Sequence, residues 1–204
     1  MRKTKYLFII ISALILSLAS INVNAQTARR VLDKTAANVS KAKGGATASF
    51  SISGGAGSLA GSLSIKGNKF FASTGQGKVW NDGKTQWTWT RSTNEVTISR
   101  PNDAQQMKAN PYKFISIYKS GYRLSMKNSG GNYQVHLQAM HPARSIQEAY
   151  ITVTRSYYPT QIRMRQGKSW TTINISNFRI HSVSDGTFRF NKNACPGAEI
   201  VDLR

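Results

Sequence analysis

A tryptophan-rich stretch, residues 79–99, constrains the fold of this chain more than any other segment. Within it, Trp87 and Trp89 alternate with polar residues, and Val96 and Ile98 repeat the alternation after a turn-forming tetrapeptide. Because successive side chains of a strand point to opposite faces of a sheet, this spacing predicts antiparallel strands with both indoles on one face. Such an apolar face belongs either to the core of a β-sandwich or barrel, or to a curved sheet that binds a hydrophobic ligand.

Residues 1–25 have the features of an export signal. Basic residues precede an apolar run, and Ala25 ends a Val-Asn-Ala sequence of the kind that a signal peptidase recognises. The run is short for a membrane span, which needs ~20 apolar residues, although an uncleaved anchor is the alternative. The sequence therefore predicts a cleaved signal peptide and a mature protein, residues 26–204, that folds as a single domain in the periplasm or outside the cell.

The mature chain is strongly basic. The whole sequence has a net charge of +20, and removing the signal takes away three basic residues and no acidic ones, which leaves +17. This charge can attract anionic membranes, acidic polysaccharides or nucleic acid, but its scatter over predicted strands and turns favours a solvated exterior over a nucleic-acid groove. The single cysteine, Cys195, cannot form an internal disulfide and is interpreted as a small buried hydrophobic side chain.

Two segments have the spacing of apolar residues that is typical of an amphipathic helix. The first is residues 27–43, which Gly44-Gly45 ends, and the second lies within residues 101–119, where Asn110 and Pro111 favour a helix start. Because large apolar faces are unstable in water, we expect these segments to cover the sheet as a lid. The candidate lid residues are Val31, Leu32, Tyr112, Ile115 and Tyr118.

Most of the remaining chain consists of short alternating segments separated by Gly, Asn, Asp and Ser turns. Asp82-Gly83 predicts a type I′ turn, residues 170–175 and 178–180 predict two separate strands, and residues 188–190 predict a late strand. About eleven antiparallel strands follow from this pattern, and a single sheet of that size must curl. The fold class is therefore mainly β with helical additions.

Four motifs stand in a characteristic order: Asn81–Trp87, Asn94–Ile98, Asn110–Tyr118 and Pro196–Arg204. Behind an export signal and an amphipathic helix, they resemble the periplasmic outer-membrane lipoprotein carrier (LolA-like) family, in a Bacteroidota-type form. The resemblance covers essentially the whole mature chain. It implies an unclosed half-barrel whose helical lid covers a hydrophobic cavity.

The resemblance also implies a function. A member of the family takes the acyl chains of a lipoprotein released by an inner-membrane complex and delivers them to an outer-membrane acceptor. Burying one CH₂ group gives roughly 0.8 kcal/mol, so such a site needs a large apolar surface and no charged anchor. Our candidate cavity residues are Phe50, Leu63, Phe71, Trp87, Trp89, Leu124 and Ile151, for each of which core packing is the alternative.

One departure from the family pattern concerns the lid. Members of the family have an Arg-Pro pair after the second long strand, and the arginine helps to latch the lid shut. The matching positions here are Gly67 and Asn68, with Lys66 just before them. We therefore expect lid closure to depend on apolar contacts alone.

Other function classes are less consistent with the sequence. His136, His141 and His181 lack metal-ligand spacing and the acidic residues are dispersed, so we expect no enzyme activity, metal or cofactor. We expect a monomer that binds acylated lipoproteins or lipids and no nucleic acid. A general carrier of lipids or hydrophobic ligands, or a lipid sensor, is the main alternative on the same fold. A basic module for anionic glycans or nucleic acid, with steeply salt-dependent binding, is the third.

Overall fold

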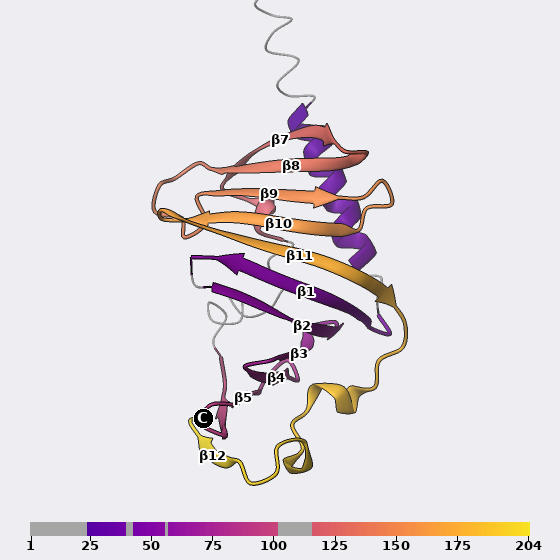
Figure 1. Cartoon of the computed structure of the whole chain (residues 1–204). Helices are drawn as coiled ribbons and strands as arrows, with labels where there is room; N and C mark the ends of the chain where they lie inside the picture. The colour runs from indigo at the N-terminus through magenta and orange to yellow at the C-terminus, as the bar shows by residue number, and fades with distance from the viewer. Residues whose placement is uncertain (1–23, 40–42, 56, 102–115) are drawn as a thin grey trace, which may run out of the picture.

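The computed structural model describes residues 24–39, 43–55, 57–101 and 116–204 of the chain (Figure 1). Nearly all of the predicted signal peptide lies outside these residues. So does most of the second predicted helix, including the lid candidates Tyr112 and Ile115. These parts of the sequence analysis remain predictions.

Twelve strands of the described chain form one sheet, in the order β12-β6-β5-β4-β3-β2-β1-β11-β10-β9-β8-β7. Two antiparallel meanders, β1–β6 and β7–β11, are joined where β1 pairs with β11, and β12 adds to β6 in parallel. The strands are β1 (Ala46–Gly54), β2 (Gly57–Lys66), β3 (Lys69–Thr74), β4 (Gly77–Asn81), β5 (Gln86–Thr90), β6 (Glu95–Ser99), β7 (Tyr122–Ser129), β8 (Asn132–Ala139), β9 (Glu148–Val153), β10 (Pro159–Gln166), β11 (Ser169–Ile180) and β12 (Glu199–Asp202). The mainly β, unclosed architecture is confirmed, with twelve strands in place of about eleven.

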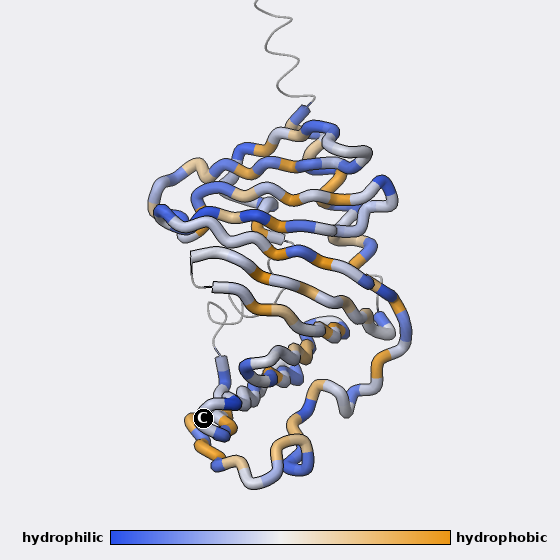
Figure 2. Tube along the Cα trace, viewed as in Figure 1, coloured by the Kyte–Doolittle hydropathy of each residue, from blue (hydrophilic) through white to orange (hydrophobic). Residues whose placement is uncertain are grey.

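The period-two alternation of the sequence explains why these segments are strands. Figure 2 shows apolar and polar residues alternating along the sheet. In β9, for example, the residues that are buried are Ala149, Ile151 and Val153, while their neighbours are half-buried. In β9 this pattern places the more deeply buried side chains on one face of the strand.

The two strands predicted at residues 170–175 and 178–180 are one continuous strand, β11. Asn177 has a φ of 53°, and the register between β1 and β11 shifts between Thr47 and Ser49. An extra residue of this kind bulges out while the ladder continues on either side of it. The polar Ser-Asn pair that suggested a break therefore marks a bulge.

The link between β4 and β5 is not the type I′ turn that Asp82-Gly83 predicted. Gly83 has a φ of 96°, but Asp82 is not among the described residues with positive φ. The Asp82 carboxylate accepts hydrogen bonds from the backbone N–H groups of Lys84 (3.0 Å) and Thr85 (2.8 Å). The Asp82 side chain therefore closes a four-residue loop in place of a two-residue turn.

Residues 188–190 do not form the predicted strand. Phe188 ends a 3-10 helix, η2 (Asp185–Phe188), in which the Ser184 hydroxyl accepts a hydrogen bond from the N–H of Gly186. A second 3-10 helix, η3 (Lys192–Ala194), follows before β12. The alternation of apolar residues at 188–190 did not indicate these 3-10 helices. Phe188 is completely buried because it contacts the sheet, which is formed by residues far away in the sequence.

The first predicted helix is present over residues 24–39, but its predicted end at Lys43 is wrong, because Lys43 and Gly44 form a turn. The helix crosses behind strands of the second meander (Figure 1). Just before β7, a 3-10 helix, η1 (Ile117–Lys119), brings Tyr118 into the core.

Among the described residues, no helix combines the length and the hydrophobicity that crossing a bilayer would require.

Candidate functional site

One face of the sheet carries a continuous set of apolar side chains, which we call the helix-side face. Residues directly opposite each other on neighbouring strands share a face, so the register traces the set from strand to strand. Starting at β7, it runs through Met126, Val135, Ile151, Ile162, Ile173, Ile52 and Leu59. Ala28, Val31 and Leu32 of the N-terminal helix form one buried cluster with members of this set.

Four of the predicted cavity residues lie on the helix-side face. Leu124 and Ile151 belong to the cluster that packs against the helix. Phe50 pairs with Ile175 of β11, which packs against the same cluster. Leu63 packs against a second cluster on this face, in which Val39 of the helix contacts strand residues such as Phe70. The prediction of a shared face is correct for these four.

Phe71, Trp87 and Trp89 lie on the other face of the sheet, which we call the outer face. Leu63 pairs with Ala72, so its neighbour Phe71 points the opposite way, and Phe71 itself pairs with Trp80. Trp80 in turn pairs with Trp87. The expectation that all seven residues line one face is wrong for these three, because the register of β3 and β4 turns the indoles away from the helix.

The C-terminal segment covers these aromatic residues. Trp80, Val96 and Cys195 form a buried cluster, with Phe71, Trp87, Trp89, Phe190 and Ala198 packed against it. We call this set the tryptophan cluster. Phe190 meets the Trp80 ring edge-on at 5.3 Å between centroids, and Cys195 is buried, as its interpretation as a small hydrophobic side chain predicted. The role of this segment was not predicted from the sequence, although apolar residues such as Phe188 and Phe190 are the signal that it packs against another part of the chain.

Lys66 also contacts the C-terminal segment. It directly precedes Gly67 and Asn68, the positions at which the family has its Arg-Pro pair. Its Nζ donates to the carbonyl oxygen of Val183 (3.1 Å) and lies 3.3 Å from the carboxylate of Asp185, which Lys69 also contacts at 2.9 Å. Hydrogen bonds from both lysines hold the pKa of Asp185 below its usual range. Among the described residues, Lys66 therefore anchors the C-terminal segment to the end of β2.

The helix is instead fastened by polar contacts that the sequence did not predict. Tyr118 as a residue is 1% exposed, and its hydroxyl donates a 2.6 Å hydrogen bond to the Asp33 carboxylate on the helix. Burial and this hydrogen bond both raise the pKa of Tyr118. On the other side, the Asn38 amide donates to the carbonyl oxygen of Ser156 at 2.9 Å. Within the described residues, polar contacts as well as apolar ones therefore hold the helix on the sheet.

A further contact joins the helix to the loop between β9 and β10. The ammonium group of Lys34 lies 3.2 Å from the Tyr157 hydroxyl and 4.6 Å from the centroid of its ring. The Tyr157 ring stacks on Tyr133 at 5.8 Å. Val31, Leu32 and Tyr118, the lid candidates within the described residues, are thus buried at one interface between helix, η1 and sheet.

At the centre of the helix-side face, apolar side chains are only half-buried. Ile173 and Ile175 pack against the first cluster and Leu63 against the second, so this surface lies between the two. Gly61 leaves room for Phe50 there, because a Cβ at Gly61 would lie 3.0 Å from the end of that ring. We call this surface the apolar strip; its members are Phe50, Ile52, Leu59, Leu63, Ile173 and Ile175.

The apolar strip has the chemistry of a binding surface for hydrocarbon. Its side chains offer no nucleophile, acid or base, and the described residues contain no group of three or more side chains that could hold a metal ion. Four members of the strip were not among the predicted cavity residues, although each alternates with polar neighbours along its strand: Ile52, Leu59, Ile173 and Ile175. Their pairing across β2, β1 and β11 is what makes them one surface.

Comparison with known proteins agrees with the architecture. Residues 18–168 match the family model described as outer membrane lipoprotein carrier protein LolA. No curated protein matches the chain in sequence. An uncharacterized conserved protein from Thermus thermophilus has a similar structure, with a TM-score of 0.58 at 13% identity over 86% of this chain and 99% of that one. At this identity the likeness concerns the fold alone.

Two further solved structures are similar at a lower level. A LolA superfamily protein from Nitrosomonas europaea has a TM-score of 0.43 and 10% identity, covering 80% of this chain and 97% of its own. The lipoprotein LppX of Mycobacterium tuberculosis has a TM-score of 0.44 and 10% identity, covering 76% of this chain and 98% of its own.

Proposed function

Since the chain belongs to the outer membrane lipoprotein carrier (LolA) family, we propose that it is a periplasmic carrier that binds the acyl chains of lipoproteins on its helix-side face. The predicted signal peptide would export it, and it would accept its cargo at the inner membrane and deliver it to the outer membrane. The family consists of carrier or binding proteins rather than enzymes, and we propose the same for this chain.

The observation that carries this proposal is the apolar strip. Six half-buried apolar side chains from three adjacent strands lie between two buried clusters, beside a helix that covers the same face. A bound chain of about 15 methylene groups would gain on the order of 12 kcal/mol from burial, before the cost of ordering it. The strip therefore supports hydrocarbon binding without a charged anchor.

The second part of the proposal is a lid made of the N-terminal helix and η1. Asp33 and Tyr118 join these elements by a hydrogen bond, and Lys34 and Asn38 join the helix to the β9–β10 loop. Side-chain contacts of this kind can break without unfolding any strand. A lid that competes with the ligand for one face lowers apparent affinity in the closed state and so makes release possible.

A matched pair of substitutions on β1 tests which face binds cargo. Phe50 and Ser51 are neighbours, both are half-buried, and they point to opposite faces. We expect Phe50→Glu to abolish capture of a triacylated lipoprotein from membrane vesicles, because it places a charge in the apolar strip. Ser51→Glu adds the same charge on the outer face, so it should leave capture intact.

The assay measures soluble lipoprotein bound to the processed protein, and circular dichroism confirms that both variants are folded. Equal capture by the two folded variants would contradict the assignment of the helix-side face. A wild-type protein that binds free fatty acid or phospholipid but leaves the lipoprotein in the vesicles would support the alternative function, a general lipid carrier or sensor. Absence of all these activities would refute the proposal.

A further inference from the structure

The outer face of β7–β11 carries a row of rings across neighbouring strands. His136 of β8 stacks on Tyr150 of β9 with centroids 4.5 Å apart, and Tyr150 lies 6.0 Å from Trp170 of β11. Between these two strands, the guanidinium of Arg163 lies 4.2 Å from the centre of the Trp170 ring. Aromatic and cationic side chains thus form one layer on the side of the sheet that the N-terminal helix does not cover.

The acidic residue in this row, Glu148, is fully engaged. Its carboxylate accepts a hydrogen bond from the Tyr150 hydroxyl (2.8 Å) and from Nε of Arg165 (3.2 Å), and it lies 3.0 Å from Nε2 of His136. The Tyr150 hydrogen bond in particular holds the pKa of Glu148 below its usual range. This carboxylate therefore pairs with Arg165 and orients two rings, and among the described residues it forms no ion pair with the other cations of this face.

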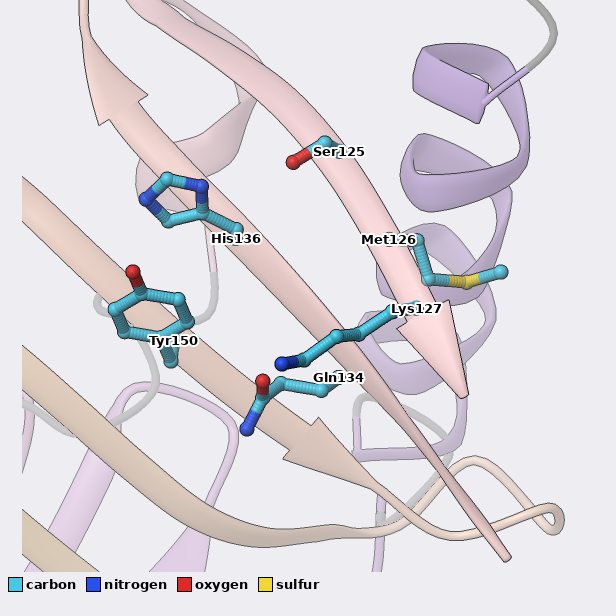
Figure 3. Close-up of a pocket in the computed structure, with 6 residues that line it drawn as sticks. All are labelled: Ser125, Met126, Lys127, Gln134, His136 and Tyr150. Carbon is cyan, nitrogen blue, oxygen red and sulfur yellow. The ribbon is translucent and has the colours of Figure 1, made fainter. Parts of the chain in front are cut away.

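Two of those cations are exposed, Lys127 of β7 and Arg163 of β10. Within the described residues, neither has a carboxylate within ion-pair distance. Lys127 borders a depression of about 210 Å³ that is also lined by Ser125, Met126, Gln134, His136 and Tyr150 (Figure 3). Figure 3 shows the Lys127 side chain extending over this depression toward Gln134. A cation beside polar hydrogen-bonding groups is suited to an anionic oxygen.

We propose that this cationic-aromatic patch, made of Lys127, His136, Tyr150, Arg163 and Trp170, docks the protein on bilayers of anionic phospholipid, with one headgroup phosphate in the depression beside Lys127. The inference rests on the proposed carrier function, which requires the protein to meet membranes. Charge complementarity supports the bilayer as the occupant, since the processed chain would have a net charge of +17. Tyr and Trp have amphipathic rings that favour the headgroup region.

The position of the patch leaves the proposed cargo site accessible during docking. His136 and Val135 are neighbours on β8, so they point to opposite faces, and Val135 belongs to the cluster that contacts the helix. A molecule docked through the patch would therefore keep its helix-side face and lid away from the bilayer surface. Membrane contact and acyl-chain binding then use separate surfaces and can be removed separately.

The test compares two double variants that lose the same charge. Lys127→Gln/Arg163→Gln alters the patch, and the control Lys84→Gln/Lys192→Gln alters two exposed lysines near the other end of the sheet. Binding of the processed protein to vesicles of phosphatidylglycerol and phosphatidylcholine is measured by sedimentation at low salt, with pure phosphatidylcholine as reference. Each lysine or arginine at an anionic surface contributes roughly a fivefold factor, so the patch variant should bind about 25-fold more weakly than wild type. The control should stay within about threefold.

A second readout reports where the bilayer touches the protein. Brominated phosphatidylglycerol should quench the fluorescence of Trp170, because this ring lies in the patch, whereas the other tryptophans belong to the tryptophan cluster. The folded variant Trp170→Phe should lose most of the lipid-dependent quenching. A purely structural role of the patch would produce no such signal.

Three results would overturn the inference. These are equal loss of vesicle binding in both double variants, equal binding to charged and uncharged vesicles, and binding to heparin or single-stranded DNA without binding to vesicles. A failure of the carrier proposal can be distinguished from a failure of this inference, because vesicle binding and fatty-acid binding are measured separately. Phe50→Glu should retain vesicle binding, and the patch variant should retain binding of a fluorescent fatty acid in solution.

Discussion

The hydrogen bond between Tyr118 and Asp33 offers the sharpest test of a closed lid. Replacing Tyr118 by Phe removes one hydroxyl group and keeps the ring that packs between helix and sheet. The bond is short, 2.6 Å, and its donor is almost completely buried. Because Asp33 is exposed on the helix, water can solvate it once the hydroxyl is gone.

The expected magnitude follows from this geometry. A hydrogen bond to a charged group contributes about 1.5–3 kcal/mol, and the lower end applies because the acceptor regains water. A loss of about 1.4 kcal/mol corresponds to a tenfold change in an equilibrium constant. If the closed lid blocks the apolar strip, Tyr118→Phe should increase the open population about tenfold and lower the apparent Kd for a fluorescent fatty acid by a similar factor.

A matched control exists in the same buried cluster. The hydroxyl of Tyr122 donates a 2.9 Å hydrogen bond to the carbonyl oxygen of Ile146, which is not part of the helix. Tyr122→Phe should therefore reduce stability without raising the affinity for fatty acid. Hydrogen exchange of the helix amides should accelerate in Tyr118→Phe and not in Tyr122→Phe.

The same bond gives a pH signature. The pKa of Tyr118 is raised in the folded protein, by burial first and by the hydrogen bond to Asp33 second. A raised folded-state pKa contributes stability that is complete below the unfolded value of about 10 and is lost as the pH rises through the folded value. The stability difference between wild type and Tyr118→Phe should therefore shrink above pH ~10. Unchanged fatty-acid affinity and unchanged helix exchange in folded Tyr118→Phe would refute the lid.

The remaining predictions concern the sheet. Gly77→Ala should lower the melting temperature by several degrees, because a Cβ at that position would lie 2.1 Å from the carbonyl oxygen of Trp89, whereas Gly75→Ala meets no atom within 4 Å and should be nearly neutral. Equal melting temperatures of the two variants would contradict this prediction, because they would mean that β4 and β5 accommodate the added methyl group without loss of stability. Glu148→Gln should destabilise the protein at neutral pH, since the depressed pKa of Glu148 contributes stability above its unfolded value. That difference should disappear in urea titrations as the pH falls through the depressed value, and a constant difference down to pH ~2 would contradict the assignment.

Much of the local structure could be predicted from the sequence. Alternation defined most strands, and helical spacing located Val31 and Leu32 on a buried face of the N-terminal helix. The family followed from the order of motifs. These features are local, because side chains alternate with period two in a strand and recur every three or four residues in a helix, whatever the rest of the chain does.

The tertiary structure alone determined which apolar residues act together. Leu63 and Trp87 each lie in an alternating strand, but the pairing of β2 through β5 places them on opposite faces. A shift of one residue in a strand exchanges its two faces, so alternation cannot say which face meets the helix. The partner of each face is equally non-local: the tryptophan cluster is covered by residues near the C-terminus, and Tyr118 bonds to a helix residue far away in sequence. The sequence determined which side chains of each strand could be buried. The long-range register determined which other residues they pack against.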